Sequence, residues 1–345
     1  MRFGIIGSGS WATAIAKILT DSHHSLNWWI RNENLLRHLE SQGHNPQYLR
    51  SVYFDTGKLK LSGSVQQVIR DSNCVILAAP SAYIEKILEP LPASVFNGKQ
   101  ILSAVKGILP GRNLLLNEYL KNQFGFETDQ YFTLMGPCHA EEIADEKLSY
   151  LTFSGLHVTP TLEIASNFST GYVNTITNTD IYGVQYAAVL KNIYALGAGM
   201  AHGLEYGDNF LSVFIANCAD EMAGFLHKVG IRHIEVGIHD DDASRPVKKS
   251  ANYAASVYLG DLLVTCYSLF SRNRTFGNMI GKGYTVNAAK LELNMVAEGY
   301  NGSSCIYRIN QQLKADMPIA ETVYKILWEA VHVKEGFKLI EALLV

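Results

Sequence analysis

The sequence predicts an α/β domain built on a mostly parallel sheet, residues 1–180, followed by an all-helical domain, residues 181–345. In the first half, short runs that are apolar throughout alternate with helical segments, which is typical of parallel strands covered on both faces. From about residue 180 onward the pattern is helical, and no strand signal of comparable strength appears. A chain of 345 residues is long for one hydrophobic core and suits two domains.

The apolar runs of the first half give the expected strands. Each run is short, and turn-forming or charged residues bound most of them. A helix is expected over residues 11–19, directly after the first strand. The expected strands cover residues 3–6, 26–30, 73–79, 100–105 and 131–135, with a further candidate at 150–153.

The second half begins with a helix over residues 180–203 that is almost free of charge. Asp208 or Asn209 is suited to cap the next helix, which runs to about Lys228 and ends at Gly230. The polar stretch 232–250 carries three consecutive aspartates, 240–242, and is expected to be a solvated loop or insertion rather than a metal site. Further helices are expected over residues 253–270, 287–293, 303–313 and 318–329.

Composition excludes several classes of protein. The net charge of −3 gives no electrostatic basis for binding nucleic acid or an anionic membrane. The five cysteines are scattered without a CxxC pair, which argues against disulfides and structural zinc and for a reducing compartment. The N-terminal apolar piece is too short for a signal peptide, and no run approaches the ~18 apolar residues of a spanning helix. We therefore expect a cytoplasmic protein with no metal site and no membrane insertion.

A glycine-rich turn follows the first expected strand and opens the first expected helix. In Gly7-x-Gly9-x-x-Ala12, Gly7 permits a tight turn and Gly9 lets the backbone approach a pyrophosphate closely. The small Ala12 lets helix and strand pack closely, and the N–H groups of the helix start face the pyrophosphate. The turn predicts a site for a nicotinamide dinucleotide; a glycine turn without ligand is the alternative.

Arg31 bears on which dinucleotide is used. It stands at the end of the second expected strand, where an NAD-specific site usually has an acidic residue for the ribose 2′-hydroxyl. An arginine can pair with a 2′-phosphate or stack on adenine. This favours NADP, or use of both NADP and NAD, over the alternative of a solvated surface arginine.

Two loops leave the carboxyl ends of expected strands, where chemistry is placed in open parallel sheets. One carries Lys106, and the other spans residues 135–142. Lys106 is thus positioned where a substrate could lie, although a lysine that marks a strand end in water is the alternative.

Lys191 and Asp261 are isolated charges in apolar helices. Lys191 is the only charged residue between Ile181 and Ala201, and Asp261 is the only one between Val257 and Ser271. Because burying an unpaired charge is costly, we expect the two to meet each other or a common ligand. A purely structural buried ion pair is the alternative.

The block 271–277 adds donors for an anion. Arg272 and Asn273 supply several N–H donors suited to binding a phosphate. Taken alone, the segment would by default be predicted to form an exposed basic turn. Glu298 adds a carboxylate whose role chemistry alone does not assign. Together with the lysines, these groups support hydride transfer to a small phosphorylated ketone, because an ammonium can polarise the carbonyl and donate the proton.

The motifs described above resemble those of the bacterial-type NAD(P)-dependent glycerol-3-phosphate dehydrogenases. The matching blocks occur in the family's order and span nearly the whole chain: GSGSWATA at 7–14, AVKG at 104–107, GP at 136–137 with AE at 140–141, LKN at 190–192, GDL at 260–262, SRNR at 271–274 with FG at 276–277, and VAEGY at 296–300. The resemblance implies a Rossmann-type domain followed by a helical domain, in a homodimer. It implies reversible reduction of dihydroxyacetone phosphate to sn-glycerol 3-phosphate for glycerophospholipid synthesis.

The resemblance also implies roles for individual residues. Lys191 would be the general acid/base, Lys106 would contact both substrate and cofactor, and Asp261 would assist at the substrate. The implied substrate contacts are Lys106, Gly136, Cys138, Asp261, Ser271, Arg272 and Asn273. The implied cofactor contacts are Gly7, Gly9, Ser10, Trp11, Arg31, Lys106, Ala140, Arg272, Val296 and Glu298.

The sequence departs from the family pattern in three places. Ala12 replaces the third glycine of the turn, a substitution that the turn tolerates. Cys138-His139 stands where many members have a serine or threonine followed by an aromatic residue. The segment 234–258 looks unlike the usual small, glycine-rich approach to the aspartate motif. Two other functions stay open from the residues: a β-hydroxyacid dehydrogenase of related architecture, and a non-catalytic NADP-binding sensor.

Overall fold

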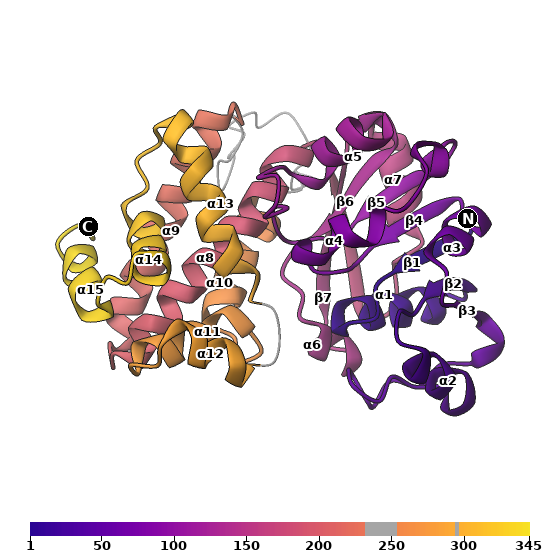
Figure 1. Ribbon diagram of the computed structural model, residues 1–345, viewed down its shortest axis with the longest axis horizontal. Coiled ribbons are helices and arrows are strands. Elements are labelled where there is room, and N and C mark those ends of the chain that lie inside the picture. Colours follow the sequence, from indigo (N-terminus) through magenta and orange to yellow (C-terminus); the bar gives the residue numbers. More distant parts are fainter. Residues whose placement is uncertain (232–253, 294–296) are drawn as a thin grey trace, which may run out of the picture. The chain divides into compact units, whose positions relative to one another are not determined.

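The computed structural model describes residues 1–231, 254–293 and 297–345. The chain forms two compact units (Figure 1). The first comprises residues 1–109 and 114–181, and the second comprises residues 110–113 and 182–345. No helix among the described residues combines the length and apolar character needed to cross a bilayer.

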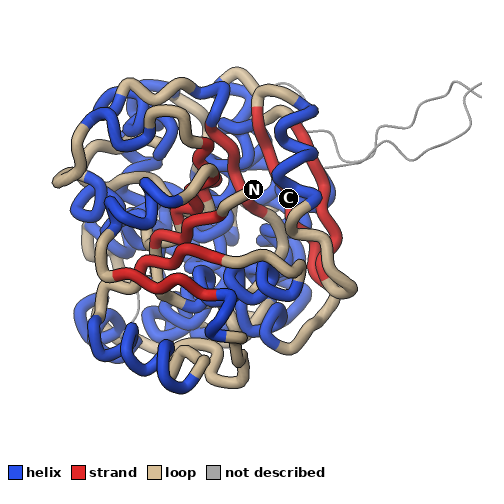
Figure 2. The backbone as a smooth tube through the Cα atoms, turned by 90° about the vertical axis from the view of Figure 1, so that its right-hand side faces the viewer, coloured by secondary structure: helices blue, strands red, loops and turns tan. Residues whose placement is uncertain are grey.

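The first unit is built on one twisted sheet, whose strands are red in Figure 2. The sheet has eight strands in the order β3-β2-β1-β4-β5-β6-β7-β8. Only the β6–β7 pairing is antiparallel. The chain runs outward from β1 to β3, then returns to the other side of β1 to form β4. This reversal creates a switch point at the carboxyl ends of β1 and β4, where ligands bind in such sheets. The strands are β1 Phe3–Ile6, β2 Leu26–Trp29, β3 Leu59–Ser62, β4 Cys74–Leu77, β5 Gln100–Ser103, β6 Tyr131–Met135, β7 Ser149–Gly155 and β8 Val173–Asn178.

Apolar clusters cover both faces of this sheet. Phe3 and Ile5 of β1 belong to one cluster, and Ile6 belongs to the other, because successive side chains of a strand point to opposite faces. The helices of the unit are α1 Ser10–Asp21, α2 Glu33–Gln42, α3 Val65–Asp71, α4 Ser81–Leu88, α5 Leu116–Phe124, α6 Ala140–Ala144 and α7 Val158–Ser166. Single 3₁₀ turns precede β3, β5 and β6 at Thr56–Lys58, Ala93–Phe96 and Thr128–Gln130.

The described part of the second unit is helical. It consists of α8 Ile181–Gly203, α9 Asp208–Val229, a π-helical stretch Ala254–Gly260, α10 Asp261–Tyr267, α11 Arg272–Gly281, α12 Val286–Leu293, α13 Glu298–Leu313, α14 Pro318–Trp328 and α15 Val333–Glu341. The predicted fold class, a mostly parallel α/β domain followed by helices, is therefore confirmed. The predicted loop at 232–250 lies outside the described residues.

Several expected details differ. The strands β3 and β8 and the helices α11 and α15 were not predicted. The cap of α9 is Gly207, which makes no side-chain hydrogen bond, so Asp208 is the first helical residue and not the cap. The expected helix over 253–270 ends at Tyr267, and its described start is π-helical.

Glycines bring α8 and α11 into backbone contact. A Cβ added to Gly277 of α11 would lie 2.0 Å from the Leu196 carbonyl oxygen of α8. One added to Gly199 of α8 would lie 2.1 Å from the Arg274 carbonyl oxygen of α11. No side chain fits between the helices at these points. The contact therefore fixes α11 closely against the helix that carries Lys191.

Candidate active site

The glycine turn between β1 and α1 has the backbone that the sequence predicts. Gly7 has φ +136°, and a Cβ there would lie 2.6 Å from the Ala78 carbonyl oxygen, at the end of β4. A Cβ on Gly9 would meet no atom within 4 Å. Gly7 is thus required by the fold, whereas Gly9 leaves open space in front of the turn.

The start of α1 is suited to an anion. Its N-cap, Gly9, makes no side-chain hydrogen bond, and the first turn contains no acidic residue. The buried indole Nε1 of Trp11, also in this turn, has no hydrogen-bond partner among the described residues. Uncapped N–H groups and the positive end of a helix dipole favour a phosphate. A dinucleotide pyrophosphate therefore fits the groups present at this turn.

Lys106 and Arg31 are two further predicted cofactor contacts, and each follows a strand of the sheet. The Nζ of Lys106, which follows β5, lies 4.7 Å from the centre of the Trp11 ring, so the structure brings these two residues together. Arg31 follows β2 and is exposed. Its side chain is therefore accessible to a ligand.

The loop after β6 places the next group of predicted residues. Gly136 has φ +116°, and a Cβ there would lie 2.7 Å from the Tyr150 carbonyl oxygen. Cys138 and Ala140 are each 7% exposed and belong to an apolar cluster of the sheet. His139 is the N-cap residue of α6 but makes no side-chain cap bond. Close packing, rather than exposure, characterises this loop.

Substitution of the two turn glycines should separate binding from folding. We expect Gly9→Ala to raise the Kd for NADPH at least tenfold, because its methyl group enters the space in front of the turn, while stability changes by about 1 kcal/mol or less. We expect Gly7→Ala to lower stability by about 2 kcal/mol or more, because the positive φ of Gly7 disfavours a residue with a side chain and the added Cβ would clash with the Ala78 carbonyl oxygen. Nucleotide titration and thermal unfolding check both; unchanged affinity in a folded Gly9→Ala would contradict the first.

In the helical unit, the predicted pairing of Lys191 and Asp261 is present. Lys191 Nζ lies 2.5 Å from Asp261 Oδ1, and the side chains are only 4% and 2% exposed. Lys191 stands within α8, and Asp261 is the first residue of α10, after Gly260. The other carboxylate oxygen of Asp261, Oδ2, is buried and has no hydrogen-bond partner among the described residues. The pair thus retains an acceptor that these residues leave unsatisfied.

The block 271–274 forms the start of α11 and not an exposed turn. Ser271 is the N-cap, and its hydroxyl accepts a hydrogen bond from Arg274 N at 3.3 Å. Asn273 is buried: its Nδ2 donates to Asn192 Oδ1 at 2.9 Å, and its Oδ1 accepts from Gly299 N at 2.9 Å. Arg272, the first helical residue, is half-buried. These bonds tie α11 to the residue next to Lys191 and to the start of α13.

Two other predicted cofactor contacts are Val296, which precedes α13 in the sequence, and Glu298. Glu298 is the first residue of α13 and is half-buried. Val296 lies outside the described residues. No cluster of three or more His, Cys, Asp or Glu side chains arranged to hold a metal ion occurs in the described ranges.

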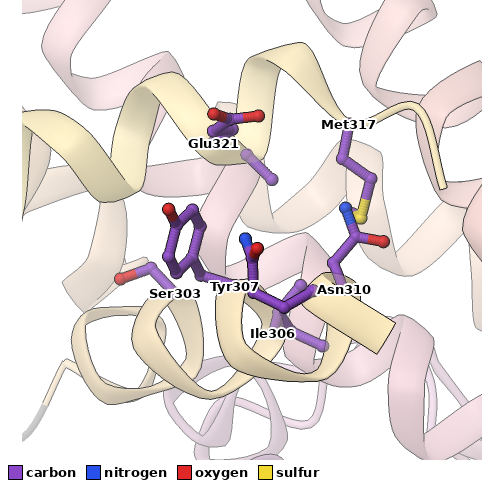
Figure 3. Close-up of a pocket in the computed structure, with 8 residues that line it drawn as sticks. Ser303, Ile306, Tyr307, Asn310, Met317 and Glu321 are labelled. Atoms are coloured by element: carbon purple, nitrogen blue, oxygen red, sulfur yellow. The ribbon is translucent and has the colours of Figure 1, made fainter. Parts of the chain in front are cut away.

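A pocket between α13 and α14 shares no residue with the predicted site. In Figure 3 its walls include Tyr307 and Asn310 of α13 and Glu321 of α14. The Asn310 amide is engaged, because it bonds both the N–H and the carbonyl of Ala315 at 2.9 Å. The pocket offers no lysine–aspartate pair of the kind found at Lys191.

Sequence reasoning missed a buried carboxylate in the helical unit. Glu221 of α9 is 6% exposed and accepts hydrogen bonds from Ile319 N at 2.7 Å and Ala320 N at 2.9 Å, in the first turn of α14. It also accepts one from the hydroxyl of Tyr194 at 3.1 Å. Tyr194 stands three positions after Lys191 on α8. The only sequence signal was a glutamate on the apolar stripe of a helix.

Glu221 should make stability depend on pH. Burial raises its pKa from 4.5 to about 7, against the hydrogen bonds from Ala320, Ile319 and Tyr194, which lower it. The folded protein then holds this proton more tightly than the unfolded chain. The contribution of Glu221 to the free energy of unfolding is therefore fully present below pH 4.5. It decreases by about 3 kcal/mol as the pH rises to about 7.

Glu221→Gln removes this titration. We expect the difference in unfolding free energy between the wild type and this variant to fall between pH 4.5 and 7, as measured by denaturant unfolding at several pH values. Parallel curves for the two proteins would show that Glu221 does not titrate in this range.

The comparisons with known proteins cover both units. Residues 2–158 match the family model described as NAD-dependent glycerol-3-phosphate dehydrogenase N-terminus, and residues 180–338 match that described as the C-terminus. The chain is 30% identical to glycerol-3-phosphate dehydrogenase (NAD(P)+) of Chlorobium luteolum over 97% of this chain and 96% of the relative. It is 28% identical to the enzyme of the same name from Bacillus pumilus, over 97% and 92% of the two chains.

A solved structure shares the fold. The crystal structure of glycerol-3-phosphate dehydrogenase from Coxiella burnetii superposes with a TM-score of 0.86 at 22% identity, covering 99% of this chain and 98% of that one. The similarity extends through both units rather than through the nucleotide-binding sheet alone.

Proposed function

This chain belongs to the NAD-dependent glycerol-3-phosphate dehydrogenase family, and from that membership we propose that Lys191 donates the proton when it reduces dihydroxyacetone phosphate to sn-glycerol 3-phosphate. The enzyme uses NAD or NADP, and the reaction is reversible. When bound, the reduced nicotinamide supplies the hydride that the ketone carbon accepts. The residues of the chain must bind the reactants and deliver a proton to the carbonyl oxygen.

The buried Lys191–Asp261 pair is the observation that carries this assignment. An ammonium beside the carbonyl oxygen stabilises the negative charge that develops there and then transfers a proton to it. Asp261 holds Nζ through a 2.5 Å contact and thereby fixes the direction of the donor. In the reverse direction the same lysine, once deprotonated, accepts the alcohol proton.

The remaining predicted residues take binding roles in this proposal. Arg272 at the start of α11 would hold the substrate phosphate, with Ser271 and Asn273 fixing its helix. Lys106 would contact both reactants. The turn at Gly7 and Gly9 and the start of α1 would hold the dinucleotide, in a nucleotide-binding domain of residues 1–180 followed by a substrate-binding domain of residues 181–345.

Arg31 supports a preference for NADP over NAD, because its exposed guanidinium can pair with a 2′-phosphate. We further propose that the enzyme works as a homodimer in the cytoplasm and supplies glycerol 3-phosphate for phospholipid synthesis. Light scattering of the purified protein would test the dimer.

The direct test of the function is a spectrophotometric assay of NADPH and NADH oxidation. We expect oxidation of the reduced nucleotide with dihydroxyacetone phosphate and none with a panel of keto acids, and we expect no reduction of NADP+ or NAD+ with the corresponding β-hydroxyacids. Turnover of a hydroxyacid without turnover of the phosphate would identify a β-hydroxyacid dehydrogenase instead. Binding of NADPH with no turnover of either class would favour a sensor.

A further inference from the structure

Each carbonyl group of the glycine turn accepts a side-chain hydrogen bond, and that of Gly9 also accepts the first backbone hydrogen bond of α1, from Thr13 N at 3.0 Å. Trp28 Nε1 donates to the Gly7 carbonyl at 2.7 Å. Asn45 Nδ2 donates to the Ser8 carbonyl at 3.2 Å. The Gly9 carbonyl accepts from the hydroxyl of Thr13 at 3.0 Å.

Holding these oxygens also orients the peptide N–H groups. In a trans peptide the N–H points opposite to the C=O of the preceding residue, so each fixed carbonyl directs the next N–H to the other face of the turn. The N–H groups concerned belong to Ser8, Gly9 and Ser10. The face of the turn at Gly9 is open, since a Cβ there would meet no atom within 4 Å.

Asn45 is the centre of this arrangement. It is 1% exposed, and besides the Ser8 carbonyl its Nδ2 donates to Thr13 Oγ1 at 3.0 Å. Its Oδ1 accepts from Gln47 N at 3.0 Å and from Tyr48 N at 3.2 Å. All four hydrogen bonds that a primary amide can make are therefore formed. Asn45 therefore holds the Ser8 carbonyl directly, whereas the Gly9 carbonyl is fixed by the backbone bond from Thr13 N.

We infer that Asn45 is a positioning residue of the dinucleotide site: it turns the Ser8 carbonyl away from the pyrophosphate and so presents the N–H group of Gly9 to it. Without Asn45, the Ser8–Gly9 peptide can rotate and bring the Ser8 carbonyl oxygen toward the phosphates, which repel it. The role rests on dinucleotide binding by the proposed enzyme, but it concerns affinity for the nucleotide and not the chemistry.

Asn45→Asp tests this role. Aspartate keeps the acceptor for Gln47 N and Tyr48 N but loses both donors and adds a negative charge next to the turn. We expect the Kd for NADPH, from nicotinamide fluorescence, to rise about 10- to 100-fold. The KM for NADPH should rise in parallel, while kcat at saturating NADPH and the KM for dihydroxyacetone phosphate stay within about threefold of wild type.

Asn27→Asp is a matched control in the same unit. Asn27 Nδ2 also donates to a carbonyl and a hydroxyl, those of Asp71 at 3.2 Å and Ser72 at 3.0 Å, but neither belongs to the glycine turn. We expect this variant to lose stability in thermal unfolding while its Kd for NADPH stays within twofold of wild type. Equal weakening of NADPH binding by both variants would overturn the role of Asn45.

Thr13→Val keeps the test valid if Asn45→Asp does not fold. It removes the hydroxyl oxygen that accepts from Asn45 Nδ2 at 3.0 Å, and thereby loosens the amide that holds the Ser8 carbonyl, while it preserves the shape of the side chain. We expect the Kd for NADPH to rise severalfold with kcat unchanged, and an unchanged Kd in the folded variant would overturn the inference. Wild-type binding of NADPH, measured first, reports on the dinucleotide site itself; its absence would overturn the site and this role together.

Discussion

Lys191→Ala is expected to lower kcat by about 100- to 10,000-fold, because the developing alkoxide loses its proton donor. The Kd for NADPH should stay within about threefold, since the nucleotide-binding turn is untouched. Steady-state kinetics with dihydroxyacetone phosphate and a separate nucleotide titration measure the two quantities. A folded variant with full turnover would show that the Lys191–Asp261 pair is structural and that another group donates the proton.

The substitution also leaves Asp261 buried without its partner, which typically costs about 3–5 kcal/mol. Lys191→Met combined with Asp261→Asn removes both charges and should recover stability without recovering kcat. Lys17→Ala provides the comparison with a structural lysine. Lys17 is 8% exposed and ion-paired with Asp21 at 2.7 Å, but it has no proposed role in catalysis. This variant should lose stability and keep its kcat.

Gly277→Ala is expected to destabilise the helical unit by about 3 kcal/mol, because the new Cβ would stand 2.0 Å from the Leu196 carbonyl oxygen. A backbone carbonyl in the middle of a helix cannot rotate away, so α11 must move from α8. That movement would stretch the 2.9 Å bond between Asn273 and Asn192, and the KM for dihydroxyacetone phosphate should rise as well. Thermal unfolding should show a midpoint lower by roughly 5–10 °C.

Gly224→Ala is the matched control for this glycine. It also lies inside a helix, α9, but a Cβ there would meet no atom within 4 Å. Because alanine favours the helix over glycine, this change should raise stability by about 0.5–1 kcal/mol. If Gly277→Ala were as stable as Gly224→Ala, the close contact between α8 and α11 would be wrong.

Sequence reasoning was most successful where the signal was local. The buried strands β1, β4 and β6 consist almost entirely of apolar residues, and the turn at Gly7 follows from the order of strand, glycines and helix. The pairing of Lys191 with Asp261 followed from a simple energetic argument, since two isolated charges in apolar helices need partners.

Elements whose stability depends on distant packing were missed. The helix α11 contains Asn273, Thr275 and two glycines, which are poor helix formers, and packing of those glycines against α8 supports it. The edge strand β3 and the outer strand β8 are partly exposed and carry polar residues, so neither forms a continuous apolar run. Asn45 was missed because its partners at Ser8 and Thr13 lie more than thirty positions away.

The bond of Glu221 to the first turn of α14 has a consequence for folding order. The N-cap of α14, Met317, makes no side-chain hydrogen bond. The acceptor for the N–H of Ile319 in the first turn of α14 is instead Glu221, which stands 98 positions earlier in the sequence. A nascent α14 therefore has no local partner for this N–H group and frays until α9 docks beside it. Coupling between segments so far apart in the chain makes formation of α14 contingent on tertiary assembly, so the two helices should gain protection from hydrogen exchange together.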